Sequence, residues 1–122
     1  MSILTKRIYG QPTPADGFRV LVDRLWPRGL SKVVAAIDLW LRDIAPSTEL
    51  RTWFGHDVAR WPAFAERYRH ELTGHGELLD LLLDLERQHG AVTLLFGARD
   101  VEHNEAEVLA DVLRERPGHT HR

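Results

Sequence analysis

Two continuous apolar runs constrain the fold of this chain more than any other feature. Residues 18–26 read FRVLVDRLW, and residues 91–97 read AVTLLFG. Runs of this length that are rich in valine and leucine and lack polar alternation are typical of strands buried on both faces. Such strands need helices on either side of the sheet. The two runs therefore predict an α/β fold with a small, mostly parallel central sheet flanked by helices, in three Rossmann-like layers.

Helix signals fill most of the chain between and after these runs. Capping residues, proline and glycine stops and i, i+3, i+4 apolar spacing predict helices at 31–36, 47–54, 61–73, 77–89 and 104–116. Residues 3–9 are predicted as a short strand. Residues 37–44 fit either a strand or a helix, and we favour a strand, which gives a sheet of about four strands. The loop at 10–17 is short for a parallel crossover, so the orientation of the first strand stays open.

Length and composition limit the classes of protein. The chain has 122 residues, which fits one domain at 3–116 with a disordered tail at 117–122. It has no cysteine, which excludes disulfides, a thiolate nucleophile, iron–sulfur clusters and cysteine-bound zinc. No apolar run approaches the roughly 20 residues of a membrane helix, and residues 1–7 lack the pattern of a signal peptide. We therefore expect a soluble cytoplasmic protein.

Charge is distributed unevenly along the chain. The net charge is −2, but residues 1–61 hold nine Lys and Arg against six Asp and Glu, whereas residues 62–122 hold seven against twelve. All four tryptophans also lie in the positive half: Trp26, Trp40, Trp53 and Trp61. The chain has 14 arginines and 2 lysines, a preference that favours bidentate binding of carboxylate or phosphate but also follows from a GC-rich genome.

Polar and aromatic side chains follow the predicted strands at the edge where an open α/β sheet binds its ligands. The rule selects Arg24, Trp26 and Arg28 after the first apolar run, Asp43 and Ser47 after residues 37–44, and Arg99 and Asp100 after the second run. Together they predict an anion-binding rim with acid–base groups. The alternative is that these arginines form structural ion pairs with neighbouring aspartates. Trp26 fits equally well a stacking role or the closure of the core.

A histidine follows the predicted helix end at Gly55. His56 is a candidate general base, because the ordinary pKa of imidazole lies near neutrality, although a capping or surface role is also common. We expect no metal, because the His56-Asp57 doublet lacks further ligands in register and His70 and His75 do not share a helix face. No glycine-rich nucleotide loop and no serine-hydrolase motif is present, so no cofactor is predicted.

The string RVLVDRLWPRG at 19–29, followed by motifs through Arg99-Asp100, resembles the short-form members of domain-of-unknown-function family 488. The resemblance extends from about Lys6 to Leu113. This chain has Phe96-Gly97-Ala98 where relatives often have tyrosine first, so a role for a phenol there is in doubt. The resemblance implies an α/β fold whose first two strands are parallel, and no established activity. It also implies signature positions: Arg24, Trp26, Arg28, Asp43, Ser47, Arg51, Trp53, His56 and Asp100.

These observations predict a domain that binds or acts on a small anionic molecule, such as a phosphate or nucleotide derivative. The predicted ligand-binding residues are Arg24, Trp26, Arg28, Ser47, Arg51 and Arg99, and the predicted proton-transfer residues are Asp43, His56 and Asp100. A nucleic-acid-binding module is disfavoured by the net charge of −2 and the absence of a basic cluster. An accessory protein that binds a partner through exposed tryptophans is a third hypothesis. The sequence leaves the oligomeric state and the presence of a reaction open.

Overall fold

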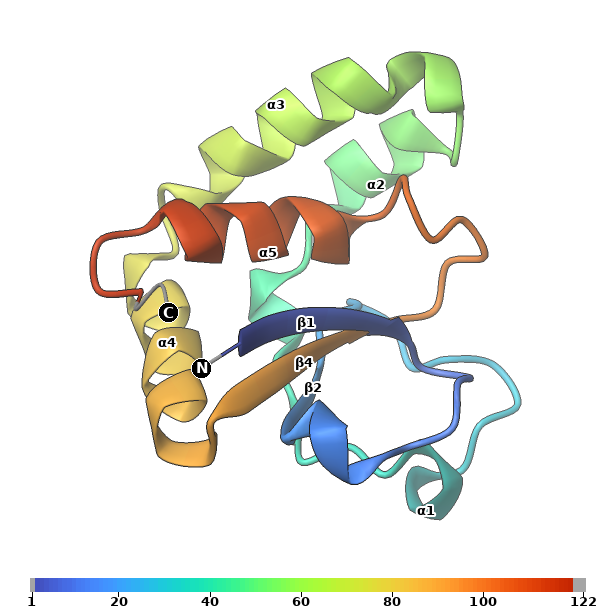
Figure 1. The fold of residues 1–122 in the computed structure, drawn as a ribbon. Helices are drawn as coiled ribbons and strands as arrows, with labels where there is room; N and C mark the ends of the chain where they lie inside the picture. The colour runs from blue at the N-terminus through green and yellow to red at the C-terminus, as the bar shows by residue number, and fades with distance from the viewer. Residues whose placement is uncertain (1, 120–122) are drawn as a thin grey trace.

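A parallel four-stranded sheet forms the centre of the computed structural model, which describes residues 2–119 (Figure 1). The strands are β1 (Ser2–Arg7), β2 (Phe18–Leu21), β3 (Leu39–Trp40) and β4 (Ala91–Phe96), in the order β1-β4-β2-β3. β4 pairs in parallel with β1 on one side and with β2 on the other. The first strand is therefore parallel to the rest, and the short connection at 8–17 does cross from one side of β4 to the other.

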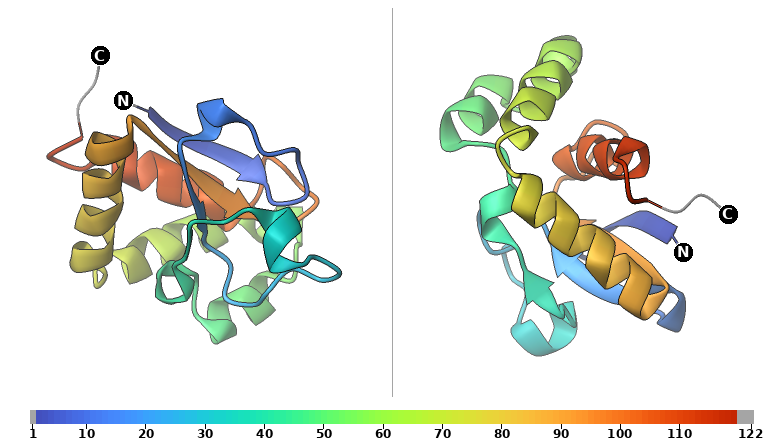
Figure 2. Two further views of the ribbon diagram at one scale, coloured as in Figure 1. Left: turned by 90° about the horizontal axis from the view of Figure 1, so that it is seen from below. Right: turned by 90° about the vertical axis from the view of Figure 1, so that its left-hand side faces the viewer.

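Helices cover both faces of the sheet unequally (Figures 1 and 2). One face carries α2 (Thr48–Phe54), α3 (Trp61–Leu72), α4 (Gly76–His89) and α5 (Glu105–Glu115). The other face carries only the short α1 (Lys32–Ala35) and the loops around it. This arrangement confirms the predicted three-layer α/β fold. Short 3-10 turns lie at Pro14–Asp16, Arg42–Ile44 and Val58–Arg60.

The buried central strand explains the apolar run at its position. Val92, Leu94 and Phe96 of β4 belong to the larger core beneath α2–α5, whereas Leu95 belongs to the smaller core on the α1 face. All four side chains are at most 2% exposed. Because both faces of the strand are covered, neither set of alternate positions requires polar residues.

The predicted helix caps form as hydrogen bonds. The hydroxyls of Ser31 and Ser47 and the side-chain carbonyl of Asn104 each accept a bond from a backbone N–H three residues later. Gly55 and Gly90 end α2 and α4 with φ values of 53° and 81°, a left-handed conformation in which glycine has no Cβ penalty.

Two predicted strands are shorter in the structure. The strand expected at 18–26 ends at Leu21. Val22 still donates its N–H to the Leu95 carbonyl at 3.1 Å, but the Asp23 carbonyl accepts the Trp40 indole N–H at 2.7 Å instead of a backbone donor of the sheet. The strand expected at 37–44 is limited to Leu39–Trp40, and residues 42–44 form a 3-10 turn. A predicted tail at 117–122 is described only to His119, where Gly118 and His119 contact α4 through Arg87 and Glu86. Residues 120–122 lie outside the described residues.

A buried ionic cluster stabilises the α1 face. The carboxylate of Asp16, 5% exposed, lies 2.5 Å from the guanidinium of Arg19 and 2.8 Å from the ammonium of Lys6. Arg19 also donates to the carbonyls of Ala35 and Ala36. Burial by itself would raise the pKa of Asp16, but hydrogen bonds from Lys6, Thr13 and Arg19 outweigh it and lower the pKa to about 2.

Asp16→Asn should lower the free energy of unfolding by about 3 kcal/mol at neutral pH, because it leaves the buried Arg19 without its counter-charge. In the native chain the contribution of Asp16 is complete above 3.8, its ordinary pKa, and is lost as the pH falls towards 2. Urea unfolding from acid to neutral pH measures both effects. The control is Asp111→Asn, whose carboxylate pairs with Arg114 at the surface. Equal stability of the two variants would contradict the prediction.

Candidate functional site

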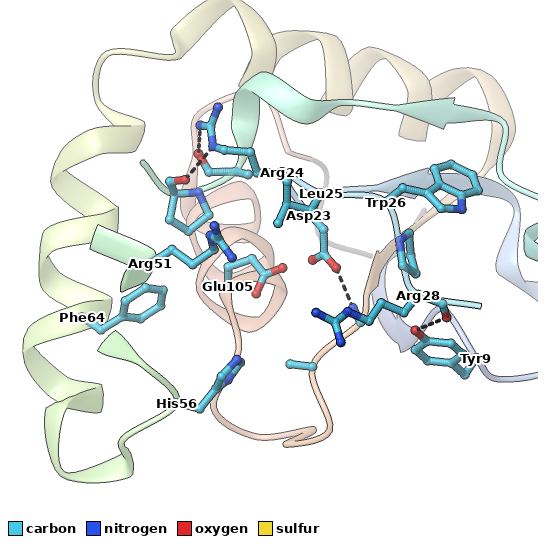
Figure 3. A pocket seen from close by; sticks show the side chains of 15 residues that line it. Tyr9, Asp23, Arg24, Leu25, Trp26, Arg28, Arg51, His56, Phe64 and Glu105 are labelled. Carbon is cyan, nitrogen blue, oxygen red and sulfur yellow. Dashed lines mark hydrogen bonds between the residues drawn. The ribbon is translucent and has the colours of Figure 1, made fainter. Parts of the chain in front are cut away.

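A pocket of about 450 Å³ opens at the edge of the sheet where the strands end (Figure 3). Its lining follows all four strands: Tyr9 after β1, residues 23–28 after β2, Ala45 and Pro46 after β3, and Gly97 and Ala98 after β4. Arg51 of α2, His56, Phe64 of α3 and Glu105 of α5 complete it. Ligands of open α/β sheets bind at this edge, where the loops of neighbouring strands meet.

The pocket includes the crevice between the ends of β2 and β4, where the chain leaves the two strands in different directions. After β2 the chain enters α1 on one face, and after β4 it enters α5 on the other. The crevice formed at such a divergence is the preferred ligand site of this architecture. Asp23 Oδ2 accepts the Gly97 N–H at 2.8 Å and so joins the two strand ends.

Three arginines line the pocket, and they differ in how far the protein already uses them. Arg24 is half-buried and donates through Nε and Nη2 to the carbonyls of Pro46 and Ala45, each at 3.2 Å. The side chains of Arg28 and Arg51 are exposed and donate no hydrogen bond within residues 2–119. Figure 3 shows both guanidinium groups directed into the pocket. These two side chains are therefore available to a ligand.

Two carboxyl groups lie between the arginines. Glu105 is the first residue of α5, and its carboxyl lies beside that of Asp23 (Figure 3), with which it shares a hydrogen bond. Burial, then that hydrogen bond and the charge of Asp23, raise the pKa of Glu105 well above its ordinary 4.5, while the charge of Arg51 opposes the shift. Glu105 therefore holds a proton at a pH where an exposed glutamate would have lost it.

His56 reaches the pocket through an unusual backbone conformation. Its φ is 60°, and the preceding Gly55 has φ 53°, so two successive left-handed residues turn the chain after α2. For a residue with a Cβ this conformation costs about 1 kcal/mol or more, and such residues concentrate at functional sites. The imidazole is exposed and its ring centroid lies 6.0 Å from that of Phe54. Asp57 caps the following turn, because its side chain accepts the Ala59 N–H at 3.0 Å.

Trp26 lines the pocket but is held mainly by the core on the α1 face. Its indole N–H donates to the Leu30 carbonyl at 2.7 Å, and its ring meets that of Trp40 edge-on at 5.4 Å. Of the two roles that the sequence left open, the contacts support closure of the core. Tyr9 lies on the other side of the turn and donates its hydroxyl to the Arg28 carbonyl at 3.0 Å.

Four residues selected from the sequence lie outside the lining of this pocket. Ser47 caps α2 and is bound by Glu71, which accepts its N–H and its hydroxyl at 2.8 and 2.6 Å. Asp100 accepts the backbone N–H groups of Glu102 and His103 and lies 2.9 Å from His103 Nδ1. These local bonds lower its pKa, the Glu102 N–H contributing most. The other two, Asp43 and Arg99, are exposed.

The structure thus brings Arg24, Trp26, Arg28, Arg51 and His56 together in this pocket. Asp43 and Ser47 line a second hollow, which they share with Arg24, and Arg99 and Asp100 line neither. Within residues 2–119 none of Arg24, Arg28 and Arg99 forms the ion pairs considered as an alternative. The residues that the sequence did not select are Asp23, Glu105, Tyr9 and Phe64. Asp23 lies within the string that resembles the family, so the sequence contained a signal for it. Glu105 could be recognised only as an acidic residue in the first turn of a predicted helix.

Among residues 2–119, no three His, Asp or Glu side chains are grouped as metal ligands. None of the helices in this part of the chain combines the length and apolar character that a membrane crossing requires.

Glu105 should make the stability of the protein fall as the pH rises. Because its pKa is higher in the folded than in the unfolded chain, unfolding releases a proton above 4.5, and rising pH favours the unfolded state. The groups that set this shift are Asp23, Arg51 and the burial of the site. Glu105→Gln cannot ionise and should remove this slope, as measured by urea unfolding between about pH 5 and 8. Glu115→Gln, at the exposed pair with Arg69, is the control; identical slopes for both variants would refute the assignment.

Comparisons with known proteins place the chain in a family. It is 44% identical over 114 residues to the uncharacterized protein YeaO of Escherichia coli K12, covering 93% of this chain and 98% of that one. It is 41% identical over 110 residues to the uncharacterized protein Rv3073c of Mycobacterium tuberculosis H37Rv, covering 90% and 92%. No solved structure matches it. A family model described as "Inactive DUF488-N3 subclade" matches residues 2–121, and the chain therefore belongs to that subclade of domain-of-unknown-function family 488.

Proposed function

We propose that this protein binds a small anionic molecule, phosphate- or nucleotide-like, in the pocket at the carboxyl ends of its strands. The observation that carries the proposal is the pair of guanidinium groups of Arg28 and Arg51, which face the pocket without a hydrogen-bond partner in residues 2–119 (Figure 3). Arginine presents several N–H donors in a planar fork that matches two oxygens of a phosphate or carboxylate.

The electrostatics of the pocket favour an anion. Arg24, Arg28 and Arg51 contribute three positive charges, against at most two negative charges from Asp23 and Glu105, and the raised pKa of Glu105 favours its neutral form. The lining is therefore net positive. The eleven-residue helix α5 begins at Glu105, so the positive end of its dipole also lies at the pocket.

The geometry supports binding more strongly than catalysis. Of the residues expected to transfer protons, only His56 reaches the pocket; Asp43 is exposed outside it, and Asp100 is bound within its own turn. His56 makes no hydrogen bond with a carboxylate that would orient its ring as a base in residues 2–119. The family description contains the word "inactive", which agrees with a domain that retains a ligand pocket without turning over a substrate.

Inorganic phosphate should raise the melting temperature of the native chain, because a ligand that binds only the folded state stabilises it. Arg28→Ala and Arg51→Ala should each weaken binding about tenfold, the value of one charge-assisted hydrogen bond. Titration calorimetry with phosphate at constant ionic strength measures the affinities. The matched control is Arg69→Ala, which removes the same charge from an exposed ion pair on α3. Phosphate affinities that are equal in all four proteins, or absent in the native chain, would contradict the proposal.

A further inference from the structure

The pocket is lined by two kinds of polar group, and the proposed anion site accounts for only one of them. Arg28 and Arg51 are exposed, whereas Asp23 and Glu105 are half-buried and lie between them (Figure 3). A purely anionic ligand would use the arginines and would be repelled by Asp23. The carboxyl pair therefore requires an explanation that inorganic phosphate does not provide.

The carboxyl oxygens are available as hydrogen-bond acceptors. Asp23 Oδ2 accepts the Gly97 N–H, and the side chains of Asp23 and Glu105 share a hydrogen bond. Each carboxyl oxygen can accept two bonds, so acceptor capacity remains after these contacts. Within residues 2–119 the only buried side-chain oxygen without a partner belongs to Glu86 of α4. The unused oxygens of the Asp23–Glu105 pair are thus reached from the pocket rather than sealed in the core.

The arginines make it unfavourable for the ligand to donate to these oxygens through a cationic group. An ammonium group on the ligand would lie beside Arg24, Arg28 and Arg51 in a partly buried site, where repulsion between like charges is poorly screened. A neutral hydroxyl donates the same hydrogen bond without that repulsion.

A nucleobase finds little stacking surface in the lining, because Phe64 and Trp26 pack against other rings and Tyr9, although 44% exposed, has Arg7 over one face. Phe64 is 3% exposed and stacks on Phe54 at 4.3 Å. The indole of Trp26 packs against Trp40 and has used its N–H on a backbone carbonyl. The ring of Tyr9 carries the guanidinium of Arg7 over it at 4.9 Å. Recognition of a base relies on stacking against such faces.

We infer that the ligand is a phosphorylated polyhydroxy compound of the sugar phosphate class, held by its phosphate at Arg28 and Arg51 and by its hydroxyls at Asp23 and Glu105. The inference rests on the proposed anion site and extends it to a second recognition point. The cavity volume of about 450 Å³ lies in the lower part of the range of ~300 to 1,000 Å³ of small-molecule pockets, which suits a compact ligand. Asp23 and Glu105 are specificity-determining residues in this assignment.

Calorimetric titration with ribose 5-phosphate, inorganic phosphate, free ribose and adenosine monophosphate tests the inference. Ribose 5-phosphate should bind the native chain at least about tenfold more tightly than inorganic phosphate, because hydrogen bonds to the carboxyl pair add to the same phosphate contacts. Glu105→Gln and Asp23→Asn should reduce that ratio. Glu49→Gln, which changes an exposed acidic residue in the first turn of α2, is the matched control and should keep the ratio of the native chain.

The results distinguish a failure of hydroxyl recognition at Asp23 and Glu105 from a failure of the anion site. If ribose 5-phosphate and inorganic phosphate bind equally, the carboxyl pair recognises no hydroxyl and the inference is wrong, while the anion site stands. If neither binds, the anion site fails and the inference fails with it. Tighter binding of adenosine monophosphate than of ribose 5-phosphate would show base recognition and would overturn the assignment. Should Asp23→Asn unfold, as judged by its melting curve, Glu105→Gln decides alone.

Discussion

The hydrogen bond between the Asp23 carboxylate and the Gly97 N–H holds the two central strands together at the point where they stop pairing. A Cβ on residue 97 would lie 3.0 Å from Asp23 Oδ2, so the approach depends on glycine at this position. The bond fixes Asp23 beside the first turn of α5, and there it meets Glu105. The floor of the pocket is therefore a consequence of how β2 and β4 end.

Several charged side chains outside the pocket are paired within the protein, whereas Arg28 and Arg51 in its lining are unpaired in the part of the chain that the structure describes. Asp16 and Arg19 neutralise each other inside the α1 face, and Glu71 is occupied by Ser47. In the pocket the arrangement differs, because Arg28 and Arg51 make no side-chain hydrogen bond or ion pair among residues 2–119, although the charge of Arg51 acts on Glu105, whose pKa is raised. Guanidinium groups without a paired carboxylate are costly at one edge of the sheet unless a solvent-exposed position or a ligand relieves them. Their exposure at the rim satisfies the first condition, and the proposed ligand would satisfy the second.

Sequence patterns predicted most of the elements because each depends on local chemistry. Ser31, Ser47 and Asn104 cap helices through bonds that span three residues, and Gly90 ends α4 through its own backbone conformation. The strand ends were harder to predict, since the apolar run at 18–26 continues after the ladder stops at Leu21. What ends the strand is a set of contacts from residues 97 and 40, which are distant in the chain.

The residues of the pocket were also predicted only in part, because some of them depend on contacts between distant parts of the chain. The strand-end rule and the family resemblance found Arg24, Trp26, Arg28, Arg51 and His56, because topology alone brings the segments after parallel strands to one edge. Neither could show that Asp100 is used by its own turn or that Ser47 is held by Glu71 from α3.

The sequence by itself determined the class of fold, a mostly parallel sheet buried on both faces, the helix caps and the sheet edge at which the pocket lies, since periodicity, capping and the order of the elements can be read along the chain. The tertiary structure alone decided which charged side chains stay free and which are neutral. Glu105 and Glu115 are glutamates at the two ends of one helix, yet Glu105 lies against a second carboxyl that raises its pKa, whereas Glu115 forms an exposed pair with Arg69. That difference arises from burial and from partners across the chain, which no local pattern of residues encodes.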